Sequence, residues 1–163
     1  MKYVNYCIIA IVSLVMSSGS IKTDTPSIGY HPGSIIPNIV LNDVEGKSLD
    51  LSEFKGKKVV VNFWAAYDAQ SRATNVQLYN FITKNYPDIE FISISFDENK
   101  SVYEKTILWD KMNGNSNFCD AKGTESEIYK EFRLEEGFKN FVINEDGVIA
   151  ATNTSIQQLK TMF

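Results

Sequence analysis

The strongest feature of the hydrophobic pattern is the run of β-branched and aromatic residues within the segment 58–64. Three valines at 59–61 are followed, after a single asparagine, by Phe63 and Trp64. β-Branched and aromatic residues that do not alternate with polar ones are typical of a strand buried on both faces of a sheet. The run therefore predicts a central strand of the fold.

An amphipathic helix is predicted directly after this strand, over residues 68–85, because apolar residues recur at helical spacing between polar ones. These apolar residues are Val76, Leu78, Phe81 and Ile82. In the next stretch, 89–96, Ile and Phe alternate with Ser, which predicts a second core strand, and a further helix is expected at 101–112. Two neighbouring strands connected through a helix run parallel, with a right-handed crossover.

The residues before the central strand predict only short elements. A strand is expected at 39–41, a turn at 45–46, and one helical turn at 51–54. Residues 21–34 contain Thr, Ser, Gly and Pro without apolar periodicity, so we expect an extended lead-in there rather than a packed element. The folded domain is accordingly predicted to cover residues 35–163.

A short helix is predicted over residues 124–132, after the second of the longer helices. Thr124 is its expected N-cap, because a threonine hydroxyl accepts a hydrogen bond from the free N–H groups of a first turn. Glu127 follows three residues later, which is the spacing of a capping box. Together these two residues set the expected start of the helix.

The last part of the sequence predicts a hairpin followed by a helix. Residues 141–143 and 148–151 are apolar and enclose a turn that contains glycine, so we expect them to pair as antiparallel strands. A last helix is expected after Thr154 or Ser155, since either residue is a good N-cap. The predicted order of the main elements is strand, helix, strand, helix, hairpin and helix.

Residues 1–20 have the order of features of a secretory signal peptide. Lys2 precedes an apolar run at 8–16, and small residues follow at 17–19. This run is shorter than the roughly 20 residues that a permanent membrane span needs, so no permanent transmembrane anchor is expected. Cys7 lies before the run rather than at the cleavage point, which argues against a lipoprotein. The chain is therefore predicted to be exported.

Charge and cysteine content argue against several classes of function. A net charge of −4 and a pI near 5.0 argue against nucleic acid as a partner, and the densest basic group, at 55–58, is expected to be a solvated edge. Removal of the signal segment leaves Cys119 as the one cysteine, so no intramolecular disulfide is expected. Because no His, Cys or carboxylate group has metal-ligand spacing, neither a metal nor another cofactor is expected.

The order of the predicted elements is that of a thioredoxin fold, and the residues themselves resemble one family with that fold. Phe-Lys-Gly-Lys at 54–57, Val-Val-Asn-Phe-Trp-Ala at 60–65 and Phe-Val-Ile-Asn at 141–144 resemble the redoxin (AhpC/TSA) and TlpA-like envelope thioredoxins. The likeness covers about residues 35–151. It implies an α/β, thioredoxin-like fold with a central mixed β-sheet flanked by helices. It also implies a location in the periplasm or cell envelope of a Gram-negative bacterium.

The resemblance breaks at the positions where this family carries Cys-x-x-Cys. In the family the first of these cysteines begins a helix, whose free N–H groups and dipole stabilise the thiolate. The matching positions here hold Asp68 and Ser71, followed by a family-like Arg72. Asp68 is expected to cap the helix, and Ser71 lacks an obvious general base because the one histidine, His31, lies in the lead-in.

A second departure concerns the proline that the family carries, with a cis peptide bond, before a late strand. The resemblance places Phe138 at that position, directly after Gly137. A cis bond before a residue other than proline costs about 3 kcal/mol, so a trans bond is expected. The substrate groove of the family is therefore expected to be altered along with its chemistry.

Three hypotheses about function follow from these departures. The first is a secreted thioredoxin-like protein without dithiol–disulfide activity, which acts as a structural module or binds a protein or peptide through Tyr67, Asp68, Ser71, Arg72 and Phe138. The second is a thiol-dependent oxidoreductase or peroxidase that uses Cys119, although a buried packing role is the ordinary role of a free cysteine. The third is acid–base or ligand chemistry at Asp68 and Arg72. The oligomeric state is left open.

Overall fold

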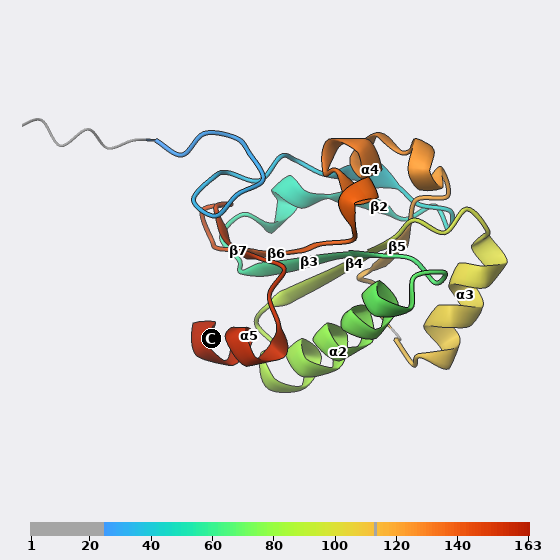
Figure 1. Cartoon of the computed structure of the whole chain (residues 1–163). Helices are drawn as coiled ribbons and strands as arrows, with labels where there is room; N and C mark the ends of the chain where they lie inside the picture. Colours follow the sequence, from blue (N-terminus) through green and yellow to red (C-terminus); the bar gives the residue numbers. More distant parts are fainter. Residues whose placement is uncertain (1–24, 113) are drawn as a thin grey trace, which may run out of the picture.

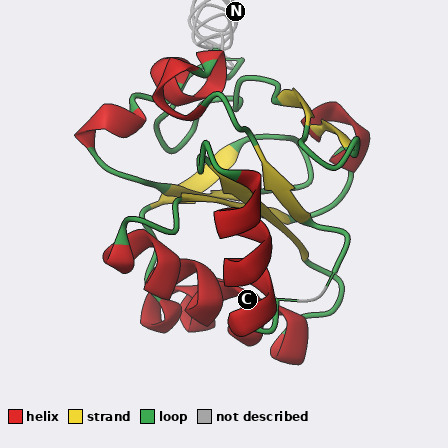
Figure 2. Cartoon of the chain, turned by 90° about the vertical axis from the view of Figure 1, so that its right-hand side faces the viewer, coloured by secondary structure: helices red, strands yellow, loops and turns green. Residues whose placement is uncertain are grey.

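The structure is a computed structural model that describes residues 25–112 and 114–163 (Figure 1). The expected signal peptide at 1–20 and the first residues of the lead-in, 21–24, lie outside the described residues. A five-stranded mixed sheet in the order β5-β4-β3-β6-β7 forms the centre of the fold. Helices cover both faces of this sheet (Figure 2). The predicted α/β, thioredoxin-like architecture is confirmed.

Strand β3, Val59–Trp64, lies in the middle of the sheet, and all six of its residues are buried. It pairs in parallel with β4, Glu90–Ser95, and antiparallel with β6, Asn140–Ile143. Between β3 and β4 runs helix α2, Ala69–Asn85. The central strand and the parallel β-α-β unit predicted from the hydrophobic pattern are therefore both confirmed.

Two apolar layers lie on opposite faces of the sheet. Residues of β3 alternate between them: Val61 and Phe63 face one layer, whereas Val60 faces the other. The first layer lies under the small β1–β2 sheet and α4, and the second lies under α2 and α5 (Figure 1). A two-sided core of this kind explains why β3 contains so little alternation of polar and apolar residues.

The remaining elements follow the predicted order closely. Helix α3, Lys100–Trp109, lies between β4 and β5, and the hairpin strand β7 pairs with β6. The expected helical turn at 51–54 is a 3-10 helix, η1. The other elements are β1, Val40–Asn42; β2, Ser48–Asp50; β5, Asn117–Cys119; η2, Gly123–Glu125; α4, Glu127–Glu131; η3, Leu134–Glu136; β7, Ile149–Thr152; and α5, Ile156–Met162.

The predicted N-cap of the short helix at 124–132 is wrong. Thr124 lies inside the 3-10 helix η2, and α4 begins only after Ser126, whose Oγ accepts a hydrogen bond from the Tyr129 N–H at 3.3 Å. Ser126 Oγ also donates to the carboxylate of Asp120, which anchors this turn to the end of β5. This contact lies outside the capping-box spacing on which the prediction rests. At the last helix, Ser155 is the N-cap and forms a capping box with Gln158.

The end of the lead-in packs against the domain, with Tyr30 on the apolar core and Gly33 and Ser34 on strand β7, which departs from the expectation of a segment without packing. Ile35 bridges Val148, and Ser34 O accepts the Ile149 N–H at 2.8 Å. The ring of Tyr30 meets Phe132 edge-on, with centroids 5.4 Å apart. Because β7 is an edge strand, its outward-facing backbone groups need partners, and the lead-in supplies some of them.

One buried amide fixes the loop after β7. The side chain of Asn140 accepts the Thr154 N–H at 2.8 Å and donates to the Thr154 carbonyl oxygen at 3.3 Å. The Asn140 carbonyl also accepts the Asn153 N–H at 2.9 Å. These three bonds hold residues 153–154 against the start of β6, which places them beside the first turns of α2.

In residues 25–112 and 114–163, no helix is long and apolar enough to cross a membrane.

Candidate functional site

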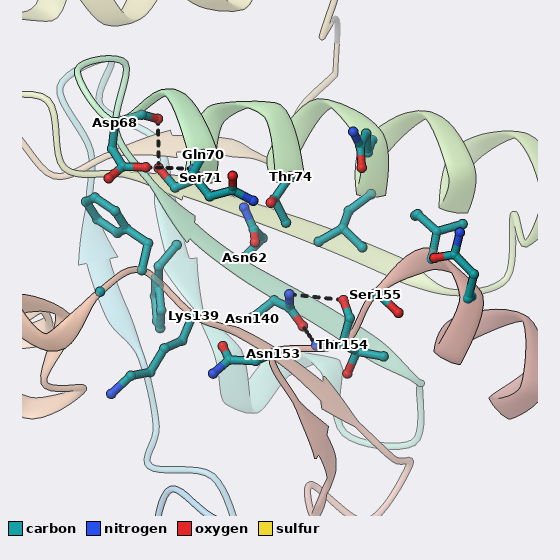
Figure 3. A pocket seen from close by; sticks show the side chains of 17 residues that line it. Asn62, Asp68, Gln70, Ser71, Thr74, Lys139, Asn140, Asn153, Thr154 and Ser155 are labelled. Atoms are coloured by element: carbon teal, nitrogen blue, oxygen red, sulfur yellow. Dashed lines mark hydrogen bonds between the residues drawn. The ribbon is translucent and has the colours of Figure 1, made fainter.

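A polar groove of about 530 Å³ lies along the first turns of α2 (Figure 3). Its opposite wall is formed by residues 137–140 before and at the start of β6, and by residues 153–157 between β7 and α5. Most of the lining residues are of polar type, and Asp68 and Lys139 are its charged residues. The neutral polar side chains are Asn62, Gln70, Ser71, Thr74, Gln77, Asn140, Asn153, Thr154, Ser155 and Gln157.

Asp68 begins α2 as its N-cap, as the sequence predicts. Its backbone is extended, and its carboxylate accepts the Ser71 N–H at 2.7 Å. The Ser71 hydroxyl donates to the Asp68 carbonyl oxygen at 3.2 Å and accepts the Ala65 N–H at 3.3 Å. Both side chains are thereby engaged in the local fold of the β3–α2 turn, and Ser71 is buried.

Arg72 forms an ion pair with Asp110. Its Nε and Nη2 donate to the two carboxylate oxygens of Asp110, each at 2.7 Å, and this pairing raises the pKa of the guanidinium. Asp110 is the C-cap of α3, so the ion pair joins the start of α2 to the end of α3. Arg72 is not among the residues that line the groove. The structure therefore does not bring Arg72 and Asp68 together as a ligand-binding pair.

Phe138 lies at the groove, and the peptide bond before it is trans, as expected. Its ring stacks on Phe96 at 6.3 Å and lies 6.3 Å from the ring of Tyr67. Tyr67 itself is 66% exposed. Of the candidate residues, the structure thus brings Asp68, Ser71 and Phe138 together in one groove, with Tyr67 at its rim.

Cys119 ends strand β5 and is completely buried. It packs against Trp64 and Tyr103, and its Sγ–H donates to the Asp97 carbonyl oxygen at 3.3 Å. Burial raises the pKa of this thiol to about 12, and the carboxylates of Asp97 and Asp120 contribute further. A nucleophilic cysteine needs access and a lowered pKa. Cys119 lacks both properties, because it is buried and its pKa is raised.

Two polar residues that shape the site are missing from the sequence-based candidates. The carboxylate of Asp97 accepts the Ala66 N–H with both oxygens, at 3.0 and 2.9 Å, and also accepts the Ser95 hydroxyl at 2.7 Å. Asn62 donates to Asn75 at 2.9 Å beneath the groove. A signal for each exists in the sequence: Asp97 follows a core strand at the edge where the β3–α2 turn lies, and Asn62 interrupts an apolar strand.

The described residues contain no group of three or more His, Cys, Asp or Glu side chains arranged to hold a metal ion. His31 lies on the exposed lead-in and does not line the groove. No imidazole is therefore available beside Ser71 within residues 25–112 and 114–163. The groove offers amide and hydroxyl groups for hydrogen bonding rather than an activated nucleophile.

Comparisons with known proteins agree with the fold and the resemblance. Residues 32–152 match the model of the AhpC/TSA family. The thiol-disulfide oxidoreductase ResA of Bacillus thuringiensis is 27% identical over 130 residues, which cover 78% of this chain and 69% of ResA. A thioredoxin-like protein from Parabacteroides distasonis has a solved structure that is 41% identical, with a TM-score of 0.73, over 85% of this chain and 98% of that one.

A third relative supports the fold alone. The structure of a thiol-disulfide oxidoreductase from Bacteroides fragilis is 23% identical, with a TM-score of 0.66. The alignment covers 77% of this chain and 94% of that one. The resemblance identified from the sequence motifs is confirmed by these matches, and so is the thioredoxin-like architecture.

The N-cap role of Asp68 can be measured directly. We expect Asp68→Ala to lower the free energy of unfolding by about 1 kcal/mol, because the free N–H groups of the first turn lose their acceptor. Asp68→Asn should keep most of that stability, since asparagine is an equally good N-cap. Urea denaturation of the three proteins checks this. An alanine variant as stable as the parent would show that the cap contributes nothing.

The accessibility of Cys119 is tested by the pH dependence of alkylation. Because burial raises the pKa of the thiol to about 12, the folded protein should react slowly and without a titration step up to about pH 10. The urea-unfolded protein should react like a small thiol, which provides the control. Fast native alkylation with a midpoint near the ordinary thiol pKa of 9.0 would contradict the buried, inert assignment.

Proposed function

The chain belongs to the AhpC/TSA family, and we propose that it acts there as a redox-silent module that binds a protein or peptide in the groove. The observation that carries the proposal is the start of α2. Where the family resemblance places two thiols, Asp68 and Ser71 are engaged with the backbone of their own turn. The one cysteine among the described residues, Cys119, is buried elsewhere in the sheet.

The chemistry of disulfide exchange supports this proposal. Exchange requires a thiolate that attacks a disulfide sulfur and forms a mixed disulfide. Neither a carboxylate nor a hydroxyl forms such an intermediate, so Asp68 and Ser71 cannot replace the thiols. The raised pKa of Cys119, at about 12, keeps this thiol protonated at neutral pH.

The lining of the groove favours an extended peptide as its occupant. Asn62 and Asn140 are buried and bonded within the chain, but the amides of Gln70, Gln77, Asn153 and Gln157 are exposed. Such amides carry both a donor and an acceptor, as the peptide main chain does, so the two can form paired hydrogen bonds. The groove is open along one side of α2, and its walls are held in place by the Asn140 bonds and the Asp68 cap. A preformed site of this kind costs little ordering on binding.

An insulin-reduction assay tests the redox-silent part of the proposal. With dithiothreitol as reductant, the chain should not exceed the uncatalysed rate, whereas a thioredoxin with an intact dithiol serves as the positive control. A variant with Asp68→Cys and Ser71→Cys should gain turnover, because both thiols return to the start of α2. Turnover by the parent chain would overturn the proposal, and loss of that turnover in Cys119→Ser would assign it to the buried thiol.

We further propose that the chain is exported to the periplasm or envelope of a Gram-negative bacterium. The order of charge, apolar run and small residues at 1–20 supports this. Expressed in a Gram-negative host, the full chain should appear in the periplasmic fraction, with mass spectrometry placing its N-terminus near residue 20. Leu14→Arg, which charges the apolar run, should retain it in the cytoplasm. A parent chain of full mass in the cytoplasm would contradict export.

A further inference from the structure

Four aromatic side chains form one connected cluster at the rim of the groove. We call Tyr67, Phe96, Tyr129 and Phe138 the aromatic cluster. The Phe138 ring lies 6.3 Å from Tyr67, 6.3 Å from Phe96 and 6.1 Å from Tyr129. Tyr129 also meets Phe96 edge-on at 5.4 Å. Phe138 belongs both to this cluster and to the lining of the groove, so the two features are continuous.

The cluster has a rigid base and an open face. Phe96 is completely buried, and Phe138 stacks on it with an interplanar angle of 24°. Tyr129 is half-buried and fixes Phe138 from the side. Tyr67 is 66% exposed, so its ring is presented to the solvent at the rim. A ligand therefore meets aromatic surface whose position is already set.

Carboxylates lie beside the exposed ring of the cluster. Asp68 follows Tyr67 in the chain and lines the groove, and the buried carboxylate of Asp97 accepts the N–H of Ala66, the residue before Tyr67, at 2.9 Å. Burial is the main cause that raises the pKa of the Tyr67 phenol, and these carboxylates and Glu98 add to it. The surface at Tyr67 is therefore both aromatic and negative.

The chain's own nearby cations are already engaged. Arg72 is held by Asp110, and the Lys139 ammonium contacts Glu136 and donates to the carbonyl oxygen of Arg133 at 3.1 Å. Within residues 25–112 and 114–163, the cation that lies over a ring is Lys58, over Phe163 and not over the cluster. The exposed ring of Tyr67 is thus open to a cation from a ligand.

We propose that the aromatic cluster is a subsite for a cationic side chain, arginine above all, of the peptide that the groove binds. This inference rests on the proposed function, whose occupant it specifies. A guanidinium is attracted to the ring faces by cation–π interaction and stacks on them in a way that an ammonium does not. The surrounding carboxylates add attraction to the same charge. The peptide main chain then continues into the amide-lined groove.

An apolar side chain is a poorer match for the same place. It would bury ring surface but would also remove water from the neighbouring carboxylates without giving them a partner. An acidic side chain would meet repulsion from Asp68 and Glu98. The combination of rings and carboxylates therefore favours a cation over an apolar side chain, whereas rings alone would also accept an apolar side chain.

The test uses the full chain on an array of short capped peptides of varied sequence. Each peptide is printed in matched forms that carry arginine, its neutral isostere citrulline, or glutamate at one position. Arginine forms should bind about two- to fivefold more tightly than their citrulline partners, a ratio set by an exposed cation–π contact. The ratio should fall as salt is added, because the carboxylates are screened.

Variants of the chain connect this preference to the cluster. Tyr67→Leu should remove the preference for arginine, whereas Tyr67→Phe should keep it, because the ring and not the hydroxyl binds the cation. Trp109→Leu is the matched control, since Trp109 is similarly exposed, at 70%, and is not part of the cluster. Thermal unfolding of each variant checks that the fold is unchanged.

The outcomes separate this inference from the function on which it rests. Equal binding of arginine and citrulline forms overturns the cationic subsite and leaves peptide binding in the groove intact. An arginine preference that survives Tyr67→Leu also overturns it, because the preference then arises elsewhere. Binding of no peptide in any form overturns both the subsite and the peptide function, and the insulin assay independently decides whether the chain is redox-silent.

Discussion

The first turn of α2 leaves backbone N–H groups without helical partners, and β3 directs them to the edge of the sheet where Phe138 and Asn140 lie. Something must accept hydrogen bonds from them. A thiolate at this place would be stabilised by the same donors and by the helix dipole. Here the Asp68 carboxylate takes the Ser71 N–H, and the Ser71 hydroxyl links back to Ala65. In this chain those donors are therefore bound by groups that support the turn, as the proposed redox-silent function requires.

The surroundings of this turn show the same use of polar groups for structure. Asp97, at the end of β4, holds the Ala66 N–H with its carboxylate and accepts the Cys119 thiol with its carbonyl oxygen. The ends of three parallel strands are therefore joined through hydrogen bonds beneath the β3–α2 turn. In this setting the Cys119 sulfur is a packing atom between Trp64 and Tyr103. Buried networks in which each member has a partner rigidify a site rather than activate it.

The sequence predicts those parts of the fold whose cause is local. Three consecutive valines require a strand with two buried faces, and the cap at Asp68 follows from the residue type alone. Side-chain contacts outside the standard spacings are beyond its reach. Ser126, which caps α4 in place of Thr124, donates its hydroxyl to Asp120, and Asn140 holds the loop at Thr154. The same limit applies to the site: the aromatic cluster joins four segments that no spacing connects.

Phe138 adds aromatic surface to the groove beside the start of α2. A proline at this position would have no aromatic ring to stack on Phe96 or to meet Tyr67. With phenylalanine there, the segment before β6 carries aromatic surface into the groove at the place where the family resemblance expects only backbone contact. The two sulfur positions become hydrogen-bonded supports, and a ring is gained beside them. On the proposed function, both features favour reversible recognition over bond formation, because each offers non-covalent contact at positions that hold no thiol.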